Sequence, residues 1–424
     1  MVIELEKKIL IRFGDLMLKG RNIRFFLKQI KLHIKEKLKD KHVQYETTHD
    51  RIYISYDNQD ESEIINRLKQ IPGIYSMSVI YLASKEIDHI VDVSIKVINK
   101  TLKTNDKTFK IETKRADKSF YLTSLELTKK IAPMILKGID LNLKVDVKHP
   151  DETLHVEVRR DQTFIYISSI LGMGGYPYAT GGKGLMMMSG GIDSPVASYL
   201  AMKQGIDLEL MHFESTPLTP LESAQKVIDL AKKLSKYTLT NKIKVHMIPF
   251  GNLHEALLKH VYDPYIITVM RRMMYRIAEI YAKQNDILVL LNGESVGQVA
   301  SQTLESMSVV EAVTKMPILR PLITYDKNDI ITIAKHIDTF DISIRPFNDC
   351  CSIYVPRNPV IKPKEHLAIN YENKFDYQAY IDDAISRVMT FEISNDFNMK
   401  LYEHGFSVKD AYEEYLKKRM NEFD

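Results

Sequence analysis

The segment 189–194, with the sequence SGGIDS, has the residue types of a phosphate-binding loop. It follows an apolar run and precedes Pro195, which suits the first turn of a helix because its missing N–H would be unpaired there. Gly190 and Gly191 leave room for backbone N–H groups to approach an anion, and we expect Ser194 to cap the helix. A helix N-terminus also favours negative charge. The segment therefore predicts a phosphate cradle at the carboxyl end of a strand.

Two common nucleotide motifs do not fit the chain. The Walker A pattern G-x-x-x-x-G-K-[ST] cannot be placed on this loop, and Gly172-x-Gly174-x-x-Pro177 lacks the third glycine of the dinucleotide fingerprint. The SGGxDS sequence instead resembles the PP-loop of ATP pyrophosphatases, which cleave ATP to AMP and pyrophosphate. An ordinary glycine turn between a strand and a helix is the simpler alternative.

The chain has two cysteines, Cys350 and Cys351, which are adjacent in a stretch that reads as a polar loop. Neighbouring Arg345 and Arg357 could lower the pKa of a thiol there and make it reactive. Two adjacent cysteines provide neither a disulfide framework nor a CxxC metal pair, and we expect no iron–sulfur cluster. This cysteine usage favours a cytoplasmic protein with reduced thiols, although an incidental reactive pair remains an alternative.

The elements that must position these groups read as a multidomain α/β protein. In the first part we expect strands at 8–13, 51–56, 108–113, 145–147, 154–158 and 163–167, and helices at 22–38, 61–70 and 124–136. Beyond the Gly/Pro-rich stretch 172–184 we expect strands at 185–188, 208–212, 243–248 and 287–291, alternating with helices from 195 and at 221–234, 265–284 and 328–336. This alternation predicts a doubly wound parallel sheet.

Positive charge is concentrated near the N-terminus. Residues 1–45 contain twelve Lys and Arg against five Asp and Glu, although the whole chain carries only +4. Such a segment suits contact with a phosphate backbone, or it is simply a solvated helix face. The candidate RNA contacts lie in 22–41 and 107–130: Lys28, Lys31, Lys35, Lys114, Arg115 and Lys118. No apolar run reaches the ~20 residues of a membrane span, and no signal peptide is visible, so we expect no membrane contact.

The order of these segments resembles the tRNA 4-thiouridine synthetase (ThiI) family. The resemblance rests on the PP-loop, on 12–15 with 18–22, and on 293–298 with 300–303. It implies a ferredoxin-like domain at 1–60, an RNA-binding THUMP domain at 61–168, a linker at 169–184 and a PP-loop ATP pyrophosphatase domain at 185–424. The implied ATP contacts are Met187, Met188, Ser189, Gly190, Gly191, Ser194, His212, Phe213, Arg271, Gly293 and Gln302. Taken singly, the methionines and His212 could be core residues and Arg271 a solvated one.

The same resemblance implies the chemistry. ATP would adenylate a tRNA uridine, at position 8 in the family, with Asp193 holding Mg²⁺ or orienting phosphates and Lys327 neutralising charge on the α-phosphate. A cysteine desulfurase would donate persulfide sulfur to Cys351, or to Cys350, giving 4-thiouridine. A sulfur-carrier protein, a secondary role in thiamine thiazole synthesis and a homodimer are further expectations. The chain ends at Asp424 without the rhodanese domain of some members, which puts the thiazole role in doubt.

Two other readings compete. PP-loop proteins also adenylate small molecules, and the basic front half argues against that substrate class. A non-catalytic RNA-binding module with a relic nucleotide site is the second alternative, and the intact loop with Asp193, Lys327 and Cys351 argues against it.

Overall fold

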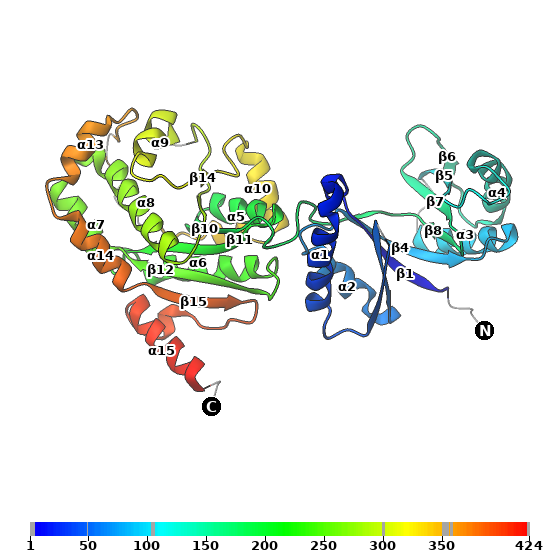
Figure 1. Ribbon diagram of the computed structural model, residues 1–424, viewed down its shortest axis with the longest axis horizontal. Coiled ribbons are helices and arrows are strands. Elements are labelled where there is room, and N and C mark those ends of the chain that lie inside the picture. The colour runs from blue at the N-terminus through cyan, green and yellow to red at the C-terminus, as the bar shows by residue number, and fades with distance from the viewer. Residues whose placement is uncertain are drawn as a thin grey trace. The chain divides into compact units, whose positions relative to one another are not determined.

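The structure is a computed structural model of the 424-residue chain, and it describes residues 5–48, 50–102, 107–298, 302–349, 356 and 359–421. The chain divides into two compact units, Met1–Gly175 and Tyr176–Asp424 (Figure 1). Within the described ranges, no helix is long and apolar enough to cross a membrane.

The first half of the N-terminal unit has a β-α-β-β-α-β order with two helices beside an antiparallel sheet. Its strands run in the order β2-β3-β1-β4, which is the ferredoxin-like arrangement. The elements are β1 (Lys7–Arg12), η1 (Asp15–Asn22), α1 (Ile23–Lys37), β2 (Val43–Thr47), β3 (Arg51–Tyr56), η2 (Asn58–Asp60), α2 (Glu61–Leu68) and β4 (Ser76–Ala83). The arrangement needs α2 and β4, both of which lie beyond residue 60.

The second half of this unit continues the same sheet through β4, which pairs with β8, so the strand order extends as β4-β8-β7-β5-β6. Its elements are α3 (Ile87–Thr101), β5 (Thr108–Arg115), α4 (Ser124–Gly138), β6 (Lys144–Val145), β7 (Glu152–Val158), β8 (Thr163–Tyr166) and β9 (Ile170–Leu171). The strand predicted at 145–147 is shorter and begins one residue earlier. Thr123 caps α4 in a capping box with Glu126, which fixes where that helix begins.

The C-terminal unit is built on a six-stranded sheet with the order β14-β13-β10-β11-β12-β15. The strands are β10 (Lys183–Met187), β11 (Asp207–Glu214), β12 (Lys242–Pro249), β13 (Val289–Leu291), β14 (Ile318–Leu319) and β15 (Met389–Ser394). Strands β10 to β13 form the predicted parallel sheet, β14 extends it in parallel without having been predicted, and β15 pairs antiparallel with β12. Strand β15 is a half-buried strand, because Met389, Phe391 and Ile393 alternate into the core.

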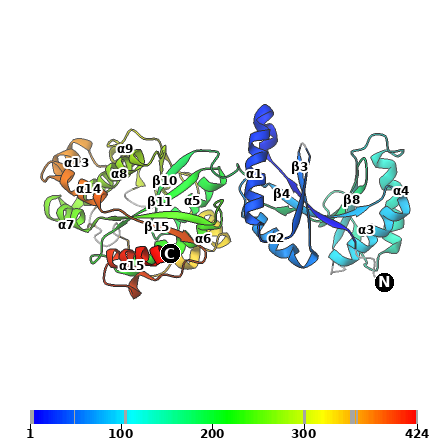
Figure 2. The ribbon, with the colours of Figure 1, turned by 60° about the horizontal axis from the view of Figure 1, so that its bottom comes forward.

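Helices cover both faces of this sheet (Figure 2). They are α5 (Asp193–Lys203), α6 (Leu221–Ser235), α7 (Gly251–His260), η3 (Asp263–Tyr265), α8 (Ile266–Gln284), α9 (Leu304–Glu311), α10 (Lys327–His336), α11 (Phe340–Ser343), α13 (Glu365–Glu372), α14 (Tyr377–Ser386), η5 (Leu401–Glu403) and α15 (Val408–Asn421). The main apolar core joins α8 to β10 and β11: Met273 and Ile277 of α8 pack with Leu185 and Met211, all fully buried. The core thereby fixes α8 beside the carboxyl end of β10.

Candidate active site

The segment 189–194 is a tight loop between the end of β10 and the start of α5. The prediction that Ser194 caps α5 is wrong, because the helix begins at Asp193 and its N-cap is Ile192. The Ser194 hydroxyl instead closes the loop on itself: its Oγ accepts from the Ser189 N–H at 3.1 Å and donates to the Ser189 carbonyl at 2.9 Å. The first and last residues of the loop are therefore joined to each other by two hydrogen bonds.

Gly293, just after β13, lies directly against this loop. A Cβ on Gly293 would be 2.8 Å from the Ser194 nitrogen and from the carbonyl carbon of Asp193. Real Cβ contacts are not this short, so the backbone approach requires glycine at this position. The two strand ends thereby form one continuous wall.

A cavity of about 360 Å³ lies at the carboxyl ends of β10, β11 and β13. All the predicted nucleotide contacts except Gly190 line it, together with Asp193 and residues of α8. The lining residues are Met187, Met188, Ser189, Gly191, Asp193, Ser194, His212, Phe213, Ile267, Arg271, Met274, Tyr275, Asn292, Gly293, Glu294, Gln302 and Asp349. Ligands of open α/β sheets bind at this edge, so the position suits a nucleotide.

The sequence left open whether His212 and Met188 belong to the core or to the site. In the structure both are core residues that also line the cavity. Both side chains are buried, and Nδ1 of His212 lies 3.0 Å from the Met188 carbonyl oxygen. Phe213 is also buried and packs edge-on against Phe250, with ring centroids 5.3 Å apart. Packing holds these three side chains in place where they line the cavity. They can therefore contact a nucleobase without losing further side-chain freedom.

Arg271 is not a solvated surface residue. Its guanidinium forms an ion pair with Glu294, whose other oxygen accepts from Nε of Arg320 at 2.9 Å and from the Asn292 amide at 2.7 Å. The side chains of Arg271 and Glu294 are only 13% and 9% exposed. This network fixes a cation at the cavity wall.

Glu294, Asn292 and Tyr275 were not predicted as site residues. Asn292 donates to the Tyr275 hydroxyl at 2.6 Å and so connects β13 to α8. The available signal was the run of polar residues directly after the apolar strand 289–291, because side chains at a strand's carboxyl end face the ligand edge.

Asp193 and Lys327 meet beside the cavity. Lys327 Nζ donates to Asp193 Oδ1 at 2.7 Å, although Lys327 itself is not among the lining residues. Gln298 joins them: the amide orientation that satisfies both neighbours places its nitrogen 3.2 Å from Asp193 Oδ2 and its oxygen 2.8 Å from Lys327 Nζ. The predicted carboxylate and cation thus lie together at the start of two helices.

The two predicted sulfur-transfer residues, Cys350 and Cys351, lie outside the described residues, as does Arg357. The preceding residue, Asp349, is described and lines the cavity, where its Oδ2 accepts from the Gly190 N–H at 2.7 Å. The segment before the cysteines therefore ends at the phosphate loop.

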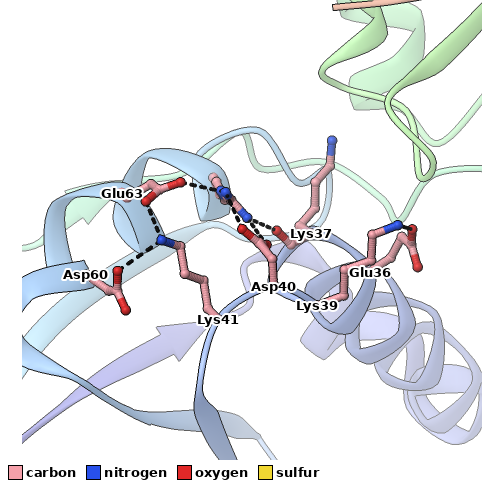
Figure 3. A network of polar contacts seen from close by, with 8 residues as sticks. Glu36, Lys37, Lys39, Asp40, Lys41, Asp60 and Glu63 are labelled. Carbon is pink, nitrogen blue, oxygen red and sulfur yellow. Dashed lines mark hydrogen bonds and ion pairs between the residues drawn. The ribbon is translucent and has the colours of Figure 1, made fainter. Parts of the chain in front are cut away.

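The predicted RNA contacts of α1 have no ion pairs in the described part of the chain. Lys28 and Lys35 are exposed and Lys31 is partly exposed. The basic residues that follow on this segment are instead paired, as Figure 3 shows for Lys39 with Glu36 and Lys41 with Asp60 and Glu63. The exposed lysines of α1 thus differ from Lys39 and Lys41, which form ion pairs directly after the helix.

The second predicted group is divided. Lys114 and Lys118 are exposed, whereas the Arg115 guanidinium donates to the carbonyls of Phe120 at 3.2 Å and Leu122 at 3.5 Å. Arg115 thus contacts the turn after β5, and one of its two terminal nitrogens donates within the protein.

The fold and the cavity define a nucleotide-binding α/β unit joined to a ferredoxin-like unit. Three family models match the chain: "Thiamine biosynthesis protein (ThiI)" at 179–377, "ThiI ferredoxin-like domain" at 8–78 and "THUMP domain" at 84–168. The chain is 56% identical to the "Probable tRNA sulfurtransferase" of Acholeplasma laidlawii over 97% of this chain and 99% of the relative. It is 43% identical to that of Halothermothrix orenii over 92% and 99%.

A solved structure, the "Crystal structure of a 4-thiouridine synthetase - RNA complex with bound ATP", matches with a TM-score of 0.82 and 32% identity, covering 92% of this chain and all of that one. The chain therefore belongs to the ThiI family of probable tRNA sulfurtransferases. The predicted fold class, a ferredoxin-like segment and THUMP domain before a mostly parallel α/β domain, is confirmed.

Proposed function

We propose that this chain uses ATP to replace the 4-oxygen of a tRNA uridine, at position 8, with sulfur, giving 4-thiouridine. One observation carries the proposal: the Asp193–Lys327 pair lies beside a cavity whose wall is the phosphate loop. The solved relative that binds RNA and ATP supports both substrates, and the exposed lysines of α1 support a tRNA backbone contact.

In the first step, uridine O4 attacks the α-phosphorus of ATP. A new O–P bond forms, the bond to the β-phosphate breaks, and pyrophosphate leaves. The Lys327 ammonium, which pairs with Asp193 of the phosphate loop, would stabilise charge that develops on the α-phosphate. Adenylation is required because a carbonyl oxygen is a poor leaving group, whereas AMP is a good one.

Asp193 is the residue that would hold Mg²⁺ against the ATP phosphates, where the ion neutralises phosphate charge. Mg²⁺ is commonly held by one or two carboxylates together with substrate phosphates, and a single loop carboxylate fits that pattern. The described residues contain no group of three or more His, Cys, Asp or Glu side chains that could hold a metal ion. The ATP phosphates would therefore have to supply further ligands.

In the second step, sulfur from a persulfide on Cys351, or on Cys350, is added at C4 and AMP leaves. A cysteine desulfurase would supply that persulfide. The persulfide's terminal sulfur either attacks C4 directly or is first released as sulfide. In both routes a thiol must supply the electrons that cleave the S–S bond, and it is oxidised to a disulfide.

Further roles belong to the same proposal. The THUMP and ferredoxin-like region would position the tRNA by its shape and backbone, while the cavity selects the base. Delivery of sulfur for thiamine thiazole synthesis would be a secondary role, a sulfur-carrier protein would be a further partner, and a homodimer is the expected assembly.

The test is mass spectrometry of nucleosides from unmodified tRNA incubated with the protein, Mg-ATP, cysteine and a cysteine desulfurase. We expect 4-thiouridine with the wild type and none with Asp193→Asn or Cys351→Ala, with Cys350→Ala distinguishing the two thiols. ATP consumption that requires a small metabolite instead of tRNA would overturn the proposal in favour of a small-molecule synthetase. No ATP consumption with tRNA would favour an RNA-binding module.

A further inference from the structure

The Asp349 carboxylate occupies an anion position in the phosphate loop. Its Oδ2 accepts from the Gly190 N–H at 2.7 Å, although 159 residues separate the two in sequence. Backbone N–H groups of such loops are the donors that bind phosphate oxygens. A carboxylate oxygen there has the charge and the hydrogen-bond geometry of a phosphate oxygen.

The segment before Asp349 is fastened so that the carboxylate reaches this place. Lys226 of α6 is 4% exposed, and its Nζ donates to the carbonyls of Arg345 at 3.0 Å and Phe347 at 3.1 Å. Ser223, one turn earlier on α6, donates to the Asn348 carbonyl at 2.7 Å. A buried lysine used for two backbone carbonyls is a costly arrangement, so it indicates a specific need to hold 345–348.

A third fastening joins the same segment to the loop itself. The hydroxyl of Ser343 donates to the Gly191 carbonyl at 3.2 Å, directly after the glycine that Asp349 contacts. The segment therefore meets the phosphate loop at two successive residues.

The contact of Asp349 is incomplete. Its second oxygen, Oδ1, is buried and has no hydrogen-bond partner among the described residues. Burial lowers the pKa of neighbouring Lys226, while the charge of Asp349 raises it, so the carboxylate helps to keep this lysine charged. One strong hydrogen bond and one unsatisfied oxygen make the carboxylate a ligand that a phosphate can replace.

We propose that Asp349 is a positioning residue that alternates with a nucleotide phosphate on the Gly190 N–H. The Gly190 N–H cannot donate a strong hydrogen bond to the carboxylate and to a phosphate at the same time. The two negative charges also repel each other when both lie near this N–H. Phosphate binding therefore requires Asp349 to leave Gly190, and departure of pyrophosphate allows it to return.

The consequence rests on the proposed function. Asp349 directly precedes Cys350 in the sequence, so the residue next to the sulfur-transfer pair responds to whether phosphate fills the loop. The order that follows is adenylation first, with sulfur transfer after pyrophosphate has left.

The experiment compares the wild type with Asp349→Asn, which keeps the shape and removes the charge. Titration calorimetry with pyrophosphate and with a non-hydrolysable ATP analogue is expected to show about tenfold tighter binding to Asp349→Asn. Asp349→Glu keeps the charge and should bind within about threefold of the wild type. Asp341→Asn, an exposed carboxylate of the same region, is the matched control and should not change the affinity.

A second measurement follows the segment 345–348 directly. The chain has no tryptophan, so Phe347→Trp provides a single fluorescent reporter on the fastened segment. Pyrophosphate should change its emission with the affinity found by calorimetry, and this change should be lost in Phe347→Trp combined with Asp349→Asn. Equal affinities in the wild type and Asp349→Asn, or an emission that pyrophosphate leaves unchanged, would overturn the proposal.

Both readouts work without tRNA or sulfur donor, so they separate this proposal from the proposed function. In the thiolation assay we expect Asp349→Asn to lower both the KM for ATP and kcat, whereas a purely structural defect would raise KM. If the binding results hold and no thiouridine forms, the alternation stands and the reaction assignment fails.

Discussion

Lys327 and Asp193 are the first residues of helices α10 and α5, and a hydrogen bond of 2.7 Å joins Nζ of the lysine to Oδ1 of the aspartate. The two side chains are 43% and 25% exposed, so both remain accessible to a bound nucleotide. An exposed pair of this kind contributes little to stability. Its position beside the phosphate loop is therefore better explained by chemistry than by folding.

Replacing Lys327 with Met should slow adenylation more than it weakens ATP binding. Removing a group that stabilises developing charge typically costs about 10²- to 10³-fold in rate, and we expect pyrophosphate release with tRNA present to fall by this factor. The ATP affinity should change by less than about fivefold. Lys335→Met, on the same helix and exposed, is the control and should keep the full rate. A Lys327→Met rate within threefold of the wild type would contradict the assigned role.

Gly293→Ala should damage the nucleotide site without unfolding the unit. The added methyl group would lie 2.8 Å from backbone atoms of Asp193 and Ser194, so the phosphate loop must shift. We expect the Kd for ATP to rise at least about tenfold, which corresponds to about 1.4 kcal/mol.

The control for this substitution is Gly251→Ala. Its added Cβ would meet its nearest atom at 3.6 Å, an ordinary contact, at the start of α7. Calorimetry with ATP should show the loss in Gly293→Ala alone, and thermal unfolding should show both variants folded. Unchanged ATP affinity in Gly293→Ala would mean that the loop adapts and that the close approach has no binding role.

Charge reversal of Lys28, Lys31 and Lys35 to Glu should weaken tRNA binding and leave ATP binding unchanged. The tRNA association constant K falls as salt rises, and each phosphate contact contributes about 0.7–0.9 to the steepness of log K against log salt. Loss of three contacts should therefore make this dependence less steep by about 2–3. The measurement is tRNA binding across a salt series.

The matched control changes Lys409, Lys417 and Lys418 of the exposed helix α15 to Glu. The net charge of the protein changes equally, so any general repulsion of tRNA is reproduced. If both triple variants lose the same affinity, α1 makes no specific contact.

The parallel sheet and the phosphate loop could be predicted because both are local patterns. Apolar strands alternate with amphipathic helices, and the glycine-serine loop stands between one such pair. Strand β15 could not be predicted in this way, because it is an antiparallel addition whose pairing with β12 connects residues about 150 positions apart. The alternation of Met389, Phe391 and Ile393 with polar residues indicates a strand, but it does not show which strand is its partner or in which direction the two pair.

The polar contacts of the site were harder to predict than its loop. Ser194 was expected to cap a helix, but tertiary context turned its hydroxyl back to Ser189. Lys226, on the inner face of α6, looked like any helix lysine, and its buried bonds to 345–347 exist only in the folded unit. Such contacts depend on long-range packing, which a single sequence does not encode in any local spacing.

Glu209 should make the C-terminal unit less stable in acid. Burial raises its pKa, but hydrogen bonds and charge from His246 and Lys244 outweigh burial and lower it to about 2 from 4.5. The folded state thus prefers the ionised form, so the stabilisation is complete above pH 4.5 and is lost as the pH falls toward 2. The full effect is about 3 kcal/mol, and somewhat less than half of it should be lost by pH 3.5.

Urea unfolding of the wild type and Glu209→Gln between pH 6 and pH 3.5 measures this contribution. The glutamine variant should be less stable at pH 6, and the difference should shrink by somewhat less than half at pH 3.5. Glu255→Gln, an exposed carboxylate on α7, should show no such pH-dependent difference. A difference between wild type and Glu209→Gln that stays constant with pH would show that the Glu209–His246 hydrogen bond of 2.9 Å acts without the carboxylate's charge.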